Sequence, residues 1–222
     1  MGLLQLAAAA LALGQTVLGS PVPEAQAVSA AAKYCDASTT ICYSEYTSPG
    51  GVTYRIAIPD TATAGAFDVL LQIVAPKAVG WAGIAWGGVM VNNPLAVAWA
   101  NGANTVVTSR SASARTYPTA YAAANYTILP GSVANTTHWT LNALAKGVSS
   151  WGTTKLDPES KAVSFAYAQS STAPSTPADP NSRFGIHNTR GKWSHDLSSA
   201  KLANFTALVQ KAQGGAKPAA LF

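Results

Sequence analysis

Apolar and polar residues alternate along much of the chain after residue 43, a pattern typical of half-buried β-strands. In "GVTYRIAIP" (51–59), apolar residues at 52, 54, 56 and 58 alternate with Thr53, Arg55 and Ala57. Further strands are expected within residues 67–76, 81–88, 95–110, 137–144 and 162–169. The segment 95–110 holds two strands joined near Asn101-Gly102, a hairpin signal. Strands at this spacing predict an antiparallel β-sandwich.

Two segments break the strand pattern near the C-terminus. Residues 168–183, "AQSSTAPSTPADPNSR", form a Pro/Ser/Thr-rich loop, and long irregular loops in compact domains are often functional. Residues 197–215, "LSSAKLANFTALVQKAQGG", predict a short helix with a serine cap and Gly214-Gly215 as its stop. Its apolar face would carry Leu202, Phe205, Leu208 and Val209. The predicted fold class is therefore all-β with one C-terminal helix.

The N-terminus is apolar enough to predict export. Residues 1–27, "MGLLQLAAAALALGQTVLGSPVPEAQA", indicate a secretory signal and a short pro-like segment, with cleavage after Gly19 or Ala27. Residues 28–213 would then form one domain, and 214–222 a flexible tail. No second segment reaches the ~18 apolar residues of a membrane span. A soluble, extracellular monomer is expected.

The cysteines and sequons agree with export. Cys35 and Cys42 are the only cysteines, and in a secreted chain they predict one disulfide that closes a tight loop. Three Asn-X-Thr sequons at Asn125, Asn135 and Asn204 are candidate glycosylation sites. The net charge of +5, with only 10% charged residues, forms no cluster that would bind nucleic acid.

Familiar catalytic signatures are absent from the sequence, which holds no G-x-S-x-G, H-E-x-x-H, P-loop or C-x-x-C-H motif. No catalytic residue is therefore nominated. The remaining ligand candidates are Met90, the only methionine besides Met1, and His138, His187 and His195. One Met and one His suffice for a six-coordinate haem. From the residues alone, the simpler interpretation of Met90 is a core side chain beside a tight turn, and His138 is expected on the surface.

Two segments resemble a known family. "VAPKAVGWAGIAWGGVMVNNPLAVAWANG" (74–102) is similar to the haem-binding segment of the cytochrome domain of fungal cellobiose dehydrogenase. "HNTRGKWSHDLSSA" (187–200) resembles the second signature of that domain, a His followed by Gly, an aromatic residue and Asp. The order and separation of the segments agree, and the resemblance covers about residues 34–212.

The resemblance implies an immunoglobulin-like antiparallel β-sandwich that holds one non-covalent haem b at one end, with Met90 and His187 as the axial ligands. His195 occupies a position that is usually apolar in the family, yet its neighbour Asp196 keeps it as an alternative ligand. Asn92, with Asn93 and Pro94, would fix the turn that presents the Met90 sulfur. Other expected cofactor-binding residues are Trp81, Trp86, Gly87, Gly88 and Trp193, and Trp99 is a further pocket candidate.

By this resemblance the protein is expected to be a stand-alone extracellular electron carrier. The donor would be a separate flavin dehydrogenase, and the acceptor a copper polysaccharide monooxygenase, a quinone or a ferric complex. The flavin domain that follows the cytochrome in cellobiose dehydrogenase is absent from this sequence, so sugar oxidation by the chain itself is not expected. Two alternatives remain: a haem-free, carbohydrate-binding β-sandwich and a structural domain without a ligand.

Overall fold

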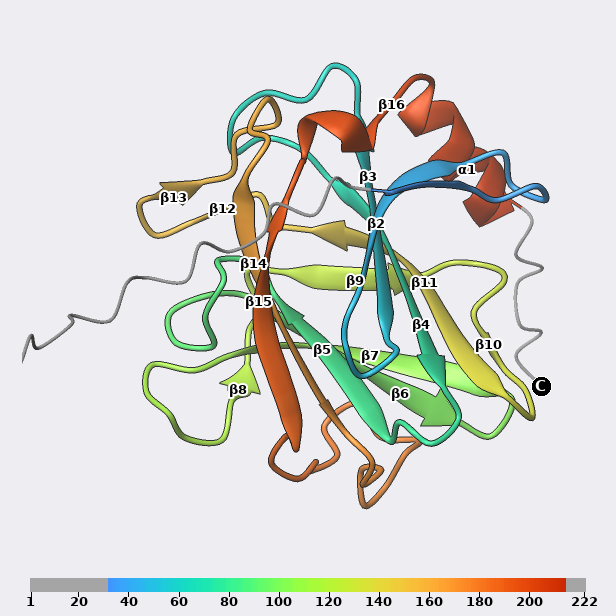
Figure 1. The fold of residues 1–222 in the computed structure, drawn as a ribbon, viewed down its shortest axis with the longest axis vertical. Coiled ribbons are helices and arrows are strands. Elements are labelled where there is room, and N and C mark those ends of the chain that lie inside the picture. Colours follow the sequence, from blue (N-terminus) through green and yellow to red (C-terminus); the bar gives the residue numbers. More distant parts are fainter. Residues whose placement is uncertain (1–31, 215–222) are drawn as a thin grey trace, which may run out of the picture.

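Two β-sheets, with almost all of their strand pairs antiparallel, pack against each other in the computed structural model, which describes residues 32–214 (Figure 1). The predicted signal segment and the tail after residue 214 lie outside the described residues. The first sheet follows the order β1-β2-β3-β4-β11-β10, with β9 beside β11 and β16 beside β3. Its strands are β1 (Ala32–Cys35), β2 (Cys42–Thr47), β3 (Thr53–Pro59), β4 (Val69–Pro76), β9 (Asn125–Ile128), β10 (Val133–Ala134), β11 (His138–Lys146) and β16 (Lys201–Leu202).

The second sheet follows the order β15-β14-β5-β6-β7-β8. Its strands are β5 (Trp81–Ala85), β6 (Leu95–Asn101), β7 (Asn104–Ser111), β8 (Thr119–Ala120), β14 (Val163–Ser170) and β15 (Thr189–His195). A separate small hairpin joins β12 (Ser150–Trp151) to β13 (Thr154–Lys155). The predicted hairpin is confirmed: β6 pairs with β7, and Gly102 turns between them with a φ of 61°.

The core lies between the two sheets. The first sheet contributes buried side chains such as Tyr54 and Ile56, and the second contributes Ile84, Trp86 and Phe165. The Tyr54 hydroxyl also donates a hydrogen bond to the Gly83 carbonyl across the sandwich, at 3.1 Å. The predicted β-sandwich is thereby confirmed.

The C-terminal helix begins later than predicted. Only α1 (Phe205–Gly214) is α-helical; a 3₁₀ turn covers Ser198–Ala200, and β16 pairs with β3 in parallel. The expected serine cap is wrong, because Asn204 precedes the helix with a left-handed φ of 58°, which breaks helical continuity. Phe205 and Val209 are nonetheless buried against the first sheet, as the apolar pattern predicts.

Candidate functional site: the outer face of the second sheet

The segment that carries Met90 is a tight turn after β5. Gly88 has a φ of 77°, and a Cβ there would overlap the hydroxyl of Ser164 on β14. A Cβ on Gly87 would overlap the amide oxygen of Asn93. Glycine is therefore needed at both positions, at Gly88 for its conformation as well as for space.

Asn93 holds this turn in shape. Its side-chain nitrogen donates to the carbonyls of Val89 and Val91, both at 3.0 Å, and its oxygen accepts from the Trp151 indole at 3.0 Å. Met90 lies between the two carbonyls that Asn93 binds. Asn92 contributes a left-handed φ of 59°, and its backbone nitrogen donates to the Ala112 carbonyl at 2.7 Å. The Trp151 contact was missed by sequence reasoning, since nothing local in the sequence links residues 58 positions apart.

The segment that carries His187 lies at the entrance of β15. The next residue, Asn188, donates its backbone N–H to the Gln169 carbonyl at 3.0 Å, and β15 begins at Thr189. Partial burial of His187, and then the positive charge of Arg190, lower the pKa of its imidazole below 6.5. His187 is therefore neutral at neutral pH, which is the form that ligates a metal.

The loop before His187 packs on the outer face of the second sheet. Phe184 packs against Trp81 and Tyr117, with ring centroids 5.1 Å apart in both pairs. The Trp99 indole donates to the Pro177 carbonyl at 2.7 Å, which ties the loop to β6. Within the described residues, the buried Trp81 indole N–H has no hydrogen-bond partner. This N–H is therefore a free donor on the outer face.

The strand register places Met90 and His187 at opposite ends of the same strands. Ala85, which leads into the Met90 turn, pairs with Ala166, whereas Trp81 pairs with Ser170 at the end near His187. The five residues of β5 between these ends span about 13 Å. The structure therefore does not bring the two side chains together at one end of the sandwich.

Between these two ends the outer face carries small side chains. Gly83, Ala85, Ala166 and Ala168 share this face, because they are cross-strand partners on β5 and β14. Two described cavities lie elsewhere: one beside Phe67 and Phe205, the other over the first sheet. We refer to Gly83, Ala85, Ala166 and Ala168 as the small-residue floor.

The other predicted tryptophans divide between the two faces. Trp86 and Trp193 point into the core, and both are almost fully buried. The Trp86 indole donates to the Tyr126 hydroxyl at 2.9 Å, and Trp193 stacks on Tyr46 at 4.6 Å. Trp81 and Trp99 belong to the cluster on the outer face. The structure therefore does not gather all of the predicted pocket walls around one site.

His195 also points into the core, at the end of the second sheet that carries the Met90 turn. It pairs with Val163 across β15 and β14 and is 1% exposed. Its Nδ1 accepts a hydrogen bond from the Trp193 indole at 3.1 Å, so the neutral ring carries its proton on Nε2. Nε2 is buried and, in the part of the chain described, has no partner. A protonated Nε2 has no lone pair for a metal, which disfavours His195 as a ligand.

The remaining predicted sites lie away from this face. The Cys35–Cys42 disulfide is confirmed, and it joins β1 to β2. Asn125, Asn135 and Asn204 are all exposed. Residues 32–214 contain no group of three or more His, Cys, Asp or Glu side chains placed to hold a metal ion. No helix among them is long and apolar enough to cross a membrane.

The donor set and its surroundings fit a haem. A thioether and a neutral imidazole are the axial ligands of many electron-transfer haems. Met90 and His187 would hold the iron from the two ends of the small-residue floor. The unpartnered Trp81 N–H suits an acidic group of such a ligand.

Comparisons with known proteins point to cytochrome domains. A family profile of the cytochrome domain of cellobiose dehydrogenase matches residues 34–207. The pyrroloquinoline quinone-dependent pyranose dehydrogenase of Coprinopsis cinerea is 26% identical over 183 residues, which are 81% of this chain and 25% of that protein. The chain thus spans about a quarter of the length of this relative.

Two solved structures share the fold. The cytochrome b domain of pyranose dehydrogenase from Coprinopsis cinerea has a TM-score of 0.75 at 24% identity, covering 82% of this chain and 95% of that one. The cytochrome domain of Myriococcum thermophilum cellobiose dehydrogenase has a TM-score of 0.72 at 24% identity, covering 82% and 96%. Because the family profile spans most of its length, the chain belongs to the family of cytochrome domains of cellobiose dehydrogenase.

Proposed function

We propose that this chain is a secreted haem b protein that passes single electrons from a sugar dehydrogenase to an extracellular acceptor. Family membership implies haem b and electron transfer in general terms. The observation that carries the proposal is that one family match spans both the Met90 turn and His187. When bound, the haem supplies an iron centre that gains and loses one electron.

Met90 and His187 would hold the iron in this proposal. Asn93 fixes the carbonyls on either side of Met90, so the thioether is presented from a braced turn. Partial burial keeps His187 neutral and able to ligate. A thioether ligand favours the reduced iron and raises the reduction potential. With Met90 and His187 both holding the iron, oxygen would find no open site on it.

The acidic side groups of the haem would be held at the rim of the outer face. Arg190 and Lys192 pair with Ala168 and Ala166, so their exposed side chains flank the small-residue floor. The Trp81 N–H supplies a further donor on the same face. A carboxylate would be stabilised there by charge-assisted hydrogen bonds.

The proposed electron donor is a separate sugar-oxidising enzyme, with a flavin as the resemblance implies. One relative is named as a pyrroloquinoline quinone-dependent pyranose dehydrogenase, which supports widening the donor class to quinone-dependent enzymes. The proposed acceptors are a copper polysaccharide monooxygenase, a quinone or a ferric complex. The disulfide and the three exposed sequons support an extracellular location.

The test is an absorption spectrum of the protein loaded with haem b. We expect a sharp Soret band, resolved α and β bands on reduction with dithionite, and a reversible one-electron redox titration. Carbon monoxide should leave the reduced spectrum unchanged, because Met90 and His187 would both hold the iron and leave it no open site. The His138→Ala variant is a matched control at an exposed histidine on β11 and should behave as wild type. A featureless spectrum after haem addition would refute the proposal.

A further inference from the structure

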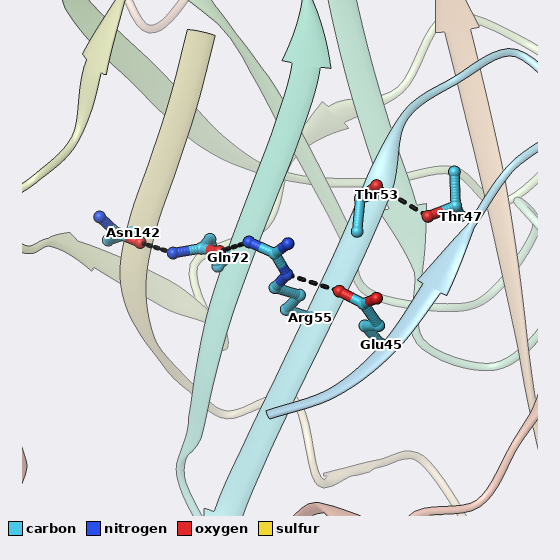
Figure 2. Close-up of polar contacts among 6 residues, drawn as sticks. All are labelled: Glu45, Thr47, Thr53, Arg55, Gln72 and Asn142. Atoms are coloured by element: carbon cyan, nitrogen blue, oxygen red, sulfur yellow. Dashed lines mark hydrogen bonds and ion pairs between the residues drawn. The ribbon is translucent and has the colours of Figure 1, made fainter. Parts of the chain in front are cut away.

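A row of polar side chains crosses the outer face of the first sheet, on the opposite side of the sandwich from the Met90 turn. Glu45, Arg55, Gln72 and Asn142 come from four neighbouring strands and lie directly opposite one another in the register. Figure 2 shows them linked side by side. Arg55 Nε donates to Glu45 at 2.8 Å, Arg55 Nη1 donates to Gln72, and Gln72 Nε2 donates to Asn142 at 2.7 Å.

A cavity of about 410 Å³ opens over this row. Tyr34 from β1 and Pro130 from the loop after β9 are among its lining residues, with Arg55, Gln72 and Asn142. The Arg55 guanidinium carbon lies 3.3 Å from the centre of the Tyr34 ring, so Arg55 stacks on one face of this ring. The cavity therefore combines an aromatic ring with a rigid array of planar polar groups.

The one positive charge that lines this cavity is already paired with a carboxylate. Arg55 pairs with Glu45, and both side chains are largely buried. The carboxylate of Asp36, the other acidic residue here, accepts bonds from the backbone N–H groups of Ser38 and Thr39, both at 2.9 Å. An anionic ligand would therefore find no free positive charge in the cavity, and it would face the Asp36 carboxylate. A neutral ligand would not have to displace an ion pair.

Hydrogen-bonding capacity nevertheless remains. The hydrogen bonds to Glu45 and Gln72 use two of the five N–H groups of the Arg55 guanidinium. Planar amide and guanidinium groups beside an aromatic ring complement a ring that carries hydroxyl groups around its edge and C–H groups on its faces. That combination is the chemistry of a pyranose sugar.

We infer that this cavity binds a neutral oligosaccharide, with sugar hydroxyls hydrogen-bonded to Arg55, Gln72 and Asn142 and a sugar ring against Tyr34. The site lies on the sheet opposite the small-residue floor. A protein held on a polysaccharide through it would keep the outer face of the second sheet free. The inference does not depend on haem binding.

The test is calorimetric titration of the purified protein with cellohexaose, xylohexaose and mannohexaose, and with an oligogalacturonate as an anionic probe. We expect saturable binding of at least one neutral hexasaccharide. Tyr34→Ala and Asn142→Ala should each weaken binding about tenfold, the effect of losing one or two good contacts. Thr53→Ala is the matched control, because Thr53 lies on the same sheet, bonded to Thr47 at 2.8 Å, and does not line the cavity.

Amide chemical-shift mapping of the wild-type protein gives a second readout that needs no variant. Shifts confined to β1, β3, β4, β11 and the loop after β9 would support the site. Three results would each overturn it: no binding of any neutral hexasaccharide, tighter binding of the oligogalacturonate, or shifts located on the second sheet. Equal binding by wild type, Tyr34→Ala and Asn142→Ala would also overturn it.

Discussion

Replacing His195 with glutamine should remove a measurable part of the acid sensitivity of the fold. Burial lowers the pKa of His195 from 6.5 to about 4, and the nearby Asp196 charge only partly opposes this. In the unfolded chain the imidazole regains its ordinary pKa. Between these two values the unfolded state binds a proton that the folded state does not, so stability falls as the pH drops from 6.5 towards 4.

The size of the effect follows from the two pKa values. Between pH 7.5 and pH 4.5, His195 should contribute about 2.5 kcal/mol to the loss of the free energy of unfolding. Glutamine does not titrate, and its side-chain oxygen can still accept the Trp193 indole N–H. Between pH 7.5 and pH 4.5, the free energy of unfolding of the variant should therefore fall by about 2.5 kcal/mol less than that of wild type.

The assay is urea unfolding of both proteins, in the same haem state, at half-unit steps from pH 8.5 to 4.5. Between pH 7.5 and 8.5, above both pKa values, the two stability curves should run parallel, which serves as the internal control. Curves that stay parallel down to pH 4.5 would refute the reasoning. They would mean that His195 titrates alike in the folded and unfolded states.

Two further predictions concern the outer face of the second sheet and its loop. Gly88→Ala should lower the free energy of unfolding by more than Gly102→Ala does. Both residues have a positive φ, but only Gly88 also packs against Ser164. If urea unfolding gave the same loss of unfolding free energy for both variants, the packing argument would be wrong. Phe184→Ala should speed proteolytic cleavage within residues 171–188, since Phe184 holds the loop on Trp81. Ile186→Ala is the control, because Ile186 is 88% exposed, and equal cleavage of the two variants would argue against this anchor.

Much of the strand framework could be predicted from the sequence. The alternation over 51–59 predicts β3, and Asn101-Gly102 predicts the β6–β7 hairpin, because both signals are local. The strand β15 was missed, since "TRGKWSH" is polar and contains glycine. It becomes a strand by pairing with β14, where Gly191 leaves room for the Tyr167 ring; a Cβ there would lie 2.6 Å from the Tyr167 hydroxyl.

The candidate residues could be nominated from the sequence, but their arrangement could not. Met90 and His187 follow from motifs, whereas their positions at opposite ends of β5 and β14 depend on strand pairing. One local signal was available. Trp81 and Trp86 are five residues apart in a strand-like run, and an odd separation indicates opposite faces of a sheet. This odd separation agrees with the structure, in which Trp81 lies on the outer face and Trp86 lies in the core.

The proposed haem ligands are tested most directly by the reduced absorption spectra of two variants, His187→Ala and His195→Ala, each loaded with haem b. We predict that His187→Ala loses haem or becomes high-spin, because the imidazole that would hold the iron together with Met90 is gone. His195→Ala should keep the sharp, low-spin spectrum of wild type, because its Nδ1 is engaged by Trp193 inside the core. The reverse pattern, with His187→Ala unchanged and His195→Ala high-spin, would contradict the assignment of the iron to His187.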